Sequence, residues 1–91
     1  MKENKSLKEC IKEYIDNLKK SESLVAKEML ADEDFNLVFP LICEQQYKEN
    51  FKDYNRGTLY GLSACLDLMW EGNWKETTKL YFPKIAEQLK W

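Results

Sequence analysis

Three polar residues on one predicted helix are the best placed in the chain for acid–base chemistry. Ser63, Asp67 and Glu71 follow one another at intervals of four, which places them on one face of a helix. Asp67 stands between two leucines in a strongly apolar segment, and a carboxyl group held away from water can act as a general acid or base. We nevertheless interpret the three residues as a solvated polar stripe, or Asp67 as the partner of a lysine or a tyrosine hydroxyl.

No other set of residues supports catalysis or metal binding. The sequence has no histidine, which excludes Ser-His-Asp and Cys-His nucleophiles and histidine-ligated metals. Cys10, Cys43 and Cys65 are far apart and include no Cys-x-x-Cys pair, so we interpret them as small, buried, reduced thiols. Glycine-rich phosphate loops and G-x-S-x-G elbows are also missing. We therefore expect a protein that is not an enzyme and has no metal site and no cofactor.

Aromatic residues favour contact with another protein. They make up 13% of the chain, and several gather towards the C-terminus. Tryptophan and tyrosine are common anchors of protein interfaces, although each of these side chains also suits a core. The prediction of a binding surface therefore concerns these aromatic residues as a group and not each residue separately. We predict a partner-binding surface that draws on Trp70, Trp74, Tyr81, Phe82 and Trp91.

An acidic run, Asp32-Glu33-Asp34, has two readings. At the start of a helix, acidic side chains cap free amide groups and suit the positive end of the helix dipole. This structural reading is the one we favour. As a docking patch, Asp32, Glu33 and Asp34 would instead steer the protein towards a basic partner surface.

Apolar residues recur at helical spacing along most of the chain, which predicts an all-α bundle of four to five helices. Three glycines and two prolines are too few for the turns of an all-β fold. Ser6-Leu7-Lys8-Glu9 is a capping box that starts a helix. We interpret Gly57, which follows Asn55-Arg56, as a left-handed residue that ends a helix, and Gly72 as the end of the next one. The predicted helices span about 7–20, 24–31, 33–54 with a bend or break at Pro40, 58–71 at the centre, and 74–90 with a bend at Pro83.

The helix predicted at 58–71 is apolar almost all round, so we expect it to be packed on several sides by neighbours or by a second copy of the protein. Gly57, Gly61 and Ala64 lie near one of its faces and allow another helix to approach closely. We expect this close packing within the chain. A homodimer seam is the alternative.

A nine-residue pattern occurs twice in the sequence. L-x-F-P-x-I-x-E-Q describes both 37–45 and 80–88, with six identities at an offset of 43. Such a period, with a proline in the first helix, resembles HEAT-type helical repeats. Duplication and chance both account for the pattern, and no HEAT function is carried over. The resemblance implies two helices that share a bend after an aromatic residue.

Length and composition predict a single helical domain over residues 1–91, with residues 1–5 frayed. The uncharged run at 58–66 is far too short to span a membrane, and no apolar segment follows the charged N-terminus, so we expect a cytoplasmic protein with no membrane association. Arg56 is the one arginine among fourteen basic residues, and the net charge is −2. Both features disfavour nucleic-acid binding.

These observations predict a small, non-catalytic protein-binding module that acts as an adaptor or inhibitor of another protein. Small phage, mobile-element and immunity-type proteins share this size and lack of chemistry, which is an analogy only. One alternative is a nucleic-acid-binding regulator of helix-turn-helix type, with Arg56-Gly57-Thr58 as its turn. Another is a homodimeric structural subunit held by the small residues at 57–64.

Overall fold

The computed structural model describes residues 6–91, apart from the side chain of Phe51. These residues form helices and no strand, which confirms the predicted all-α class. The prediction that residues 1–5 are frayed falls outside the described residues. Between residues 6 and 91 no helix is long and apolar enough to cross a membrane. The elements are α1 (Leu7–Lys20), α2 (Leu24–Ala31), α3 (Glu33–Gln46), the π-helical turn η1 (Tyr47–Phe51), α4 (Tyr54–Glu71), α5 (Trp74–Tyr81) and α6 (Pro83–Gln88).

The first two helices begin at serine caps. The Glu9 amide donates to Ser6 Oγ at 3.2 Å, and the Ser6 amide donates to Glu9 Oε1 at 3.0 Å. This reciprocal pair is the predicted capping box. Ser23 caps α2 by accepting a hydrogen bond from the Ala26 amide. Both helices have the bounds that the sequence predicts, 7–20 and 24–31.

The third helix starts at an acidic cap and runs through Pro40. Asp32 Oδ1 accepts from the Asp34 amide at 2.9 Å, which confirms the helix-start reading of the acidic run. Pro40 has no N–H to donate to Asn36, yet the predicted break is absent. The helix continues through the proline, and side chains on both sides of it are buried in the core. These side chains are Val38, Phe39, Ile42 and Cys43.

The boundary between α3 and α4 differs from the prediction. After η1, Lys52 adopts a left-handed φ of 55°. Asp53 then caps α4, because its Oδ1 accepts from the amides of Asn55 at 2.9 Å and Arg56 at 3.2 Å. The predicted stop at Gly57 is therefore wrong: Asp53 starts the helix four residues earlier, and Gly57 lies inside α4.

The segment predicted as one bent helix at 74–90 is two helices. Phe82 leaves helical geometry, with φ −135° and ψ 63°, and Pro83 becomes the first residue of α6. At this position the missing N–H of proline costs no helical hydrogen bond. The two copies of the L-x-F-P pattern therefore differ in structure, because the helix is continuous through Pro40 and is interrupted before Pro83.

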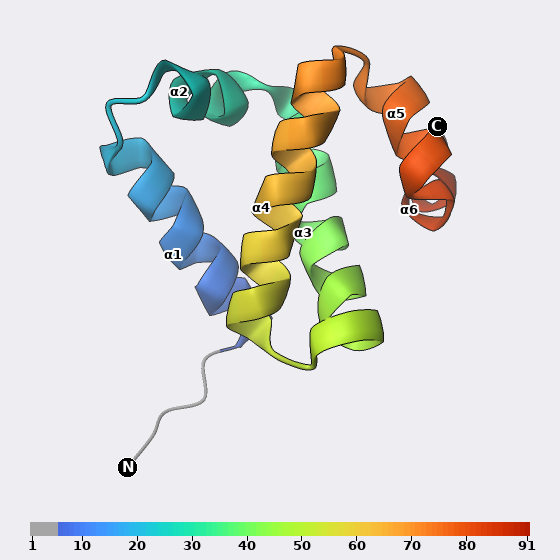
Figure 1. Cartoon of the computed structure of the whole chain (residues 1–91), viewed down its shortest axis with the longest axis horizontal. Coiled ribbons are helices and arrows are strands. Elements are labelled where there is room, and N and C mark those ends of the chain that lie inside the picture. Colours follow the sequence, from blue (N-terminus) through green and yellow to red (C-terminus); the bar gives the residue numbers. More distant parts are fainter. Residues whose placement is uncertain (1–5) are drawn as a thin grey trace.

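The fold is built around the pair α3 and α4. α4 lies in front of α3, with α1 and α2 on one side of the pair and α5 and α6 on the other (Figure 1). Along this viewing direction the Cα atoms extend over 17 Å, which is the thickness of two layers of helices. In the described part of the chain, no third layer of helices therefore covers the face of α4 that points away from α3.

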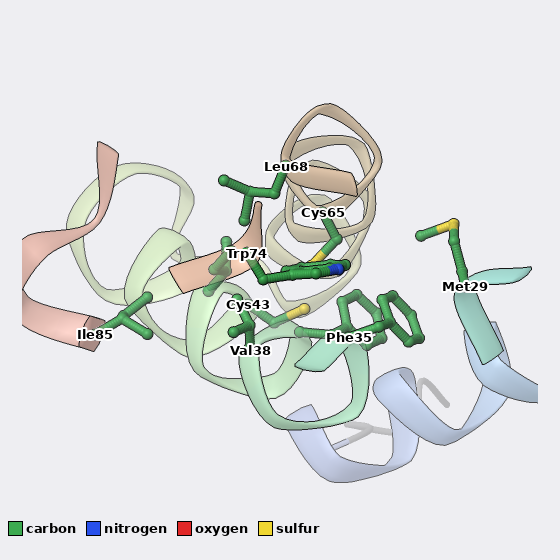
Figure 2. Close-up of a cluster of buried hydrophobic side chains, with 10 residues drawn as sticks. Met29, Phe35, Val38, Cys43, Cys65, Leu68, Trp74 and Ile85 are labelled. Carbon is green, nitrogen blue, oxygen red and sulfur yellow. The ribbon is translucent and has the colours of Figure 1, made fainter. Parts of the chain in front are cut away.

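The hydrophobic core lies between these two layers and the start of α5. Figure 2 shows the ring of Trp74 between Leu68 and Cys65 of α4 and Val38 and Phe35 of α3. The two phenylalanines of α3 stack with ring centroids 5.1 Å apart. The core therefore joins α3, α4 and α5, and it is completed by Met29 of α2 and Ile85 of α6.

Candidate protein-binding surface

The polar stripe of α4 is exposed to solvent. Ser63, Asp67 and Glu71 all have exposed side chains, as the interpretation of a solvated stripe predicts. Asp67 is not held away from water, so its position gives no support to the acid–base role of a buried carboxyl group. Its two neighbours in the chain differ, since Leu68 is buried and Leu66 is exposed.

The three cysteines are buried, free thiols, as predicted. The Cys43 thiol donates to the carbonyl oxygen of Thr58 at 3.8 Å. Burial raises the pKa of Cys43 to about 12 and also raises the pKa of Cys65, so both thiols are protonated at neutral pH. Protonated thiols are poor nucleophiles. In the described part of the chain, no group of three potential ligand side chains could hold a metal ion.

Trp74 lies in the core and not on the predicted partner surface. Its residue surface is 7% exposed, and its indole Nε1–H donates to Asp32 Oδ2 at 2.8 Å. Asp32 uses its other carboxylate oxygen to cap α3, so this residue joins the starts of α3 and α5. The structure thus corrects the prediction for both residues, because each is occupied in holding the fold together.

The other predicted site residues, near the C-terminus and at the start of α3, are buried to different degrees. Trp91 is half-buried against the core, and its amide donates to the Ala86 carbonyl at 2.9 Å, which holds the last residue on α6. Phe82 is also half-buried against the core. In the first turn of α3, Glu33 is exposed and Asp34 is half-buried.

Trp70 and Tyr81 are the predicted aromatic residues that the structure exposes. Trp70 is 85% exposed and Tyr81 is 58% exposed. Together they line a groove of about 580 Å³ between α4 and α5, which we call the aromatic groove. Tyr60, which is 54% exposed, and part of Phe82 complete its aromatic lining. The aromatic groove is therefore the part of the predicted partner surface that a partner can reach.

A tight turn places α5 against the end of α4. Gly72 ends α4 with a φ of 90°, a left-handed conformation that glycine adopts without steric cost, and it is the stop that the sequence predicts. Asn73 caps α5 by accepting from the Glu76 amide at 3.1 Å. With two residues between the helices, Trp70 remains on the outside of α4 while Trp74 turns into the core.

The aromatic groove is also acidic. Asp67 and Glu71 lie one helical turn apart on α4, and both belong to its lining. Among residues 6–91, no lysine or arginine belongs to the lining. Among residues 6–91, no ion pair involves either carboxylate. The groove therefore favours a positively charged ligand over a negatively charged one.

An apolar ridge follows the outward face of α4. Leu59 and Leu66 are 56% and 40% exposed, and with Trp70 they recur at intervals of seven and four. The two leucines also border a second groove of about 390 Å³ between α4 and the α1–α2 side, where Val25 and Met29 lie. α4 is packed by α1, α3 and α5, as predicted, but among residues 6–91 no helix covers this outward face.

Gly57 and Gly61 face α3 and are covered by it. A Cβ atom at Gly61 would lie 2.6 Å from Cys43 Sγ, and one at Gly57 would lie 3.1 Å from the Cys43 carbonyl oxygen. The close contact is therefore within the chain, and these two buried glycines are not available as a seam for a second copy. Ala64 is half-buried and lines the aromatic groove. The turn reading of Arg56-Gly57-Thr58 is also wrong, because these residues lie inside α4.

The predicted partner surface did not include three exposed residues of α4: Leu59, Tyr60 and Leu66. A usable signal was present, because a helix turns by about 100° per residue. With Gly57 and Gly61 as the inner face of α4, the same rotation places both leucines on the outer face.

Comparisons of the chain with family models, with curated proteins and with solved structures found no match.

Proposed function

We propose that this chain is a small protein-binding module that acts as an adaptor or inhibitor and has no catalytic role of its own. The observation that carries the proposal is Trp70, whose side chain is 85% exposed in the lining of the aromatic groove. Tryptophan is among the residues most enriched where protein interfaces gain their binding energy. Exposed apolar surface rimmed by polar side chains is typical of such an interface.

Burial of Trp70 by a partner would supply a large part of a binding free energy. At about 25 cal/mol per Å², covering roughly 200 Å² of apolar surface contributes about 5 kcal/mol before the costs of association. Tyr60 and Tyr81, each more than half exposed, add to the same area. A partner that covers this surface is occluded or stabilised by the module, which is the mechanism that we propose.

Affinity capture with surface variants tests the proposal. The parent protein, a Trp70→Ala/Tyr81→Ala variant and a Leu37→Ala variant are immobilised and exposed to a lysate of the source organism, and bound proteins are identified by mass spectrometry. Leu37 is 49% exposed on α3 and lies outside the aromatic groove, so it is a matched control. We expect a partner that the parent and the Leu37→Ala variant retain and that the double variant loses.

The fold of each variant is checked by circular dichroism, because only equal helicity and equal thermal midpoints make the comparison valid. Trp70 and Tyr81 are largely exposed, so their removal should change stability by less than about 0.5 kcal/mol. Capture of the same proteins by all three forms would contradict the proposed function.

The apolar ridge of α4 favours a second candidate, a homodimeric structural subunit. Leu59, Leu66 and Trp70 have the spacing with which one helix meets another along a shared seam. Sedimentation of the parent and of a Leu66→Lys variant tests this candidate. A dimer that the lysine converts to a monomer would support it, whereas a parent protein that is monomeric at all concentrations would exclude it.

A further inference from the structure

We infer that the aromatic groove binds a lysine or arginine side chain from a basic segment of the partner protein. The inference rests on the proposed function and adds the chemistry of the partner. It is carried by the lining of the groove, which combines open aromatic rings with two carboxylates and holds no basic residue.

The aromatic side chains supply surfaces for a cation. Tyr60, Trp70 and Tyr81 are each more than half exposed, so a ligand can reach their rings. An ammonium or guanidinium group over an aromatic face is attracted by the quadrupole of the ring, most strongly for tryptophan. The alkyl stem of lysine or arginine is apolar and suits the same ring surfaces.

The carboxylates decide the sign of the ligand charge. Asp67 and Glu71 are adjacent on α4, and both are exposed within the groove. A purely apolar ligand would take them out of water without a partner, which costs free energy. An acidic ligand would meet charge repulsion. A cationic side chain avoids both penalties, because it gives the carboxylates a partner.

The end of α4 adds to the negative charge of the groove. The carbonyl end of α4, where Glu71 lies, carries the partial negative charge of the helix dipole. Arg56 is in the first turn of α4, and along the helix axis it is about 16 Å from Asp67 and about 22 Å from Glu71 at 1.5 Å per residue.

The lysines of α5 do not neutralise the groove. At about 100° per residue, Lys75 and Lys79 project from the flank of α5 opposite to Thr77 and Tyr81, which are the α5 residues of the lining. Lys75 and Lys79 therefore point away from the aromatic groove.

An NMR titration with a small cationic probe tests the inference. The probe is the blocked tripeptide acetyl-Gly-Lys-Gly-amide, and its matched control carries norleucine, which keeps an apolar stem and lacks the ammonium group. The indole N–H of Trp70 is the reporter, and that of Trp74, buried and bonded to Asp32, is the internal reference. We expect the lysine peptide to shift the Trp70 signal with an affinity at least about fivefold higher than the norleucine peptide.

Charge variants then assign the effect to the two carboxylates. Asp67→Asn/Glu71→Gln keeps the shape of the groove and removes both charges, and we expect the lysine peptide to bind about tenfold more weakly. Glu28→Gln/Glu87→Gln is the matched control, because both residues are exposed, lie outside the groove and give the same net charge. This control should bind within about twofold of the parent.

Equal affinity for the lysine and norleucine peptides would overturn the inference, as would unchanged binding by the Asp67→Asn/Glu71→Gln variant. The inference and the proposed function fail in different ways. A partner that is lost with Trp70→Ala/Tyr81→Ala and retained with Asp67→Asn/Glu71→Gln leaves the protein-binding function standing and rejects the cationic ligand. A partner that both variants retain rejects the proposed function itself.

Discussion

Replacement of Gly61 by alanine should destabilise the protein, although alanine is the better helix former. A Cβ atom at this position would lie 2.6 Å from Cys43 Sγ, 3.2 Å from the Cys43 amide nitrogen and 3.3 Å from its Cα. Two of these three atoms belong to the backbone of α3 and cannot turn aside. Cys43 is fully buried, so its sulfur also has little space to move. The two helices must therefore separate or the side chain must leave its rotamer.

The size of the effect follows from two opposing contributions. Gly→Ala in the interior of a helix stabilises by about 1 kcal/mol. Insertion of a methyl group into a close-packed contact costs about 1 to 3 kcal/mol, and the three short distances at Gly61 place this case near the upper limit. The unfolding free energy should therefore fall by about 1 to 2 kcal/mol in Gly61→Ala. For a domain of this size, that corresponds to a drop in Tm of roughly 5 to 15 °C.

Urea unfolding followed by far-ultraviolet circular dichroism measures the change. Ser63→Ala is the control, because Ser63 is exposed on the same helix and reports the gain in helix propensity alone, a few tenths of a kcal/mol. A Gly61→Ala protein that is as stable as the parent would show that α3 and α4 are not in the close contact on which this reasoning depends.

A second substitution isolates the clash with the sulfur. Cys43→Ala removes the atom that lies 2.6 Å from the new Cβ, so it should be less harmful in the Gly61→Ala background than in the parent. We expect a coupling free energy of about 1 kcal/mol in the double-mutant cycle. Strict additivity of the two substitutions would refute the steric explanation.

Three further predictions concern the core. Thr78 Oγ1 is buried and has no hydrogen-bond partner among residues 6–91, so the isosteric Thr78→Val should raise the unfolding free energy by about 1 kcal/mol; a loss of stability in urea would contradict this. Trp74→Phe removes the 2.8 Å hydrogen bond to Asp32 and should lower the unfolding free energy by about 2 kcal/mol, which thermal unfolding would show. Burial raises the pKa of Cys43 to about 12 and also raises that of Cys65, so the folded chain keeps two protons that the unfolded chain loses above its thiol pKa of 9.0. The unfolding free energy should therefore fall as pH rises above 9, by up to about 2.7 kcal/mol per pH unit. This pH dependence should be shallower in Cys43→Ala. If urea unfolding gave the same pH dependence for the variant and the parent, the explanation would be rejected.

Local chemistry explains the parts of the fold that the sequence predicts well. The Ser6 capping box starts α1, the Asp32 cap starts α3, and Gly72 ends α4, each at the expected residue. In all three cases the signal and the structure it determines lie within a few residues of each other. Such hydrogen bonds and dihedral preferences depend little on the rest of the molecule.

Long-range packing explains the parts that it predicts poorly. Asp53 and Gly57 carry competing signals, a helix start and a helix stop, and the close approach of α3 is what requires a glycine at 57 within the helix. Pro40 and Pro83 occupy the same pattern, yet the helix continues through Pro40 and is interrupted before Pro83. Neither outcome can be worked out from the neighbouring residues alone.

The candidate site shows the same division. The aromatic residues were the right group, but the sequence could not separate Trp70, which is exposed, from Trp74, which is buried. Four positions and one turn separate them, and Trp74 is held by a hydrogen bond to Asp32, a residue far away in the sequence. Tyr60 joins the groove because α5 folds back beside it, which no local pattern records.

The close packing of α3 on α4 also bears on how fast the chain folds. Fewer than twenty residues separate Cys43 from Gly61, so this contact closes a short loop and costs little chain entropy. Domains dominated by such near-neighbour contacts fold in microseconds to milliseconds. The helical hairpin of α3 and α4 is therefore expected to form first, and the terminal helices to dock onto it. Substitutions at Gly61 should then slow folding, whereas those at Trp74 should mainly speed unfolding.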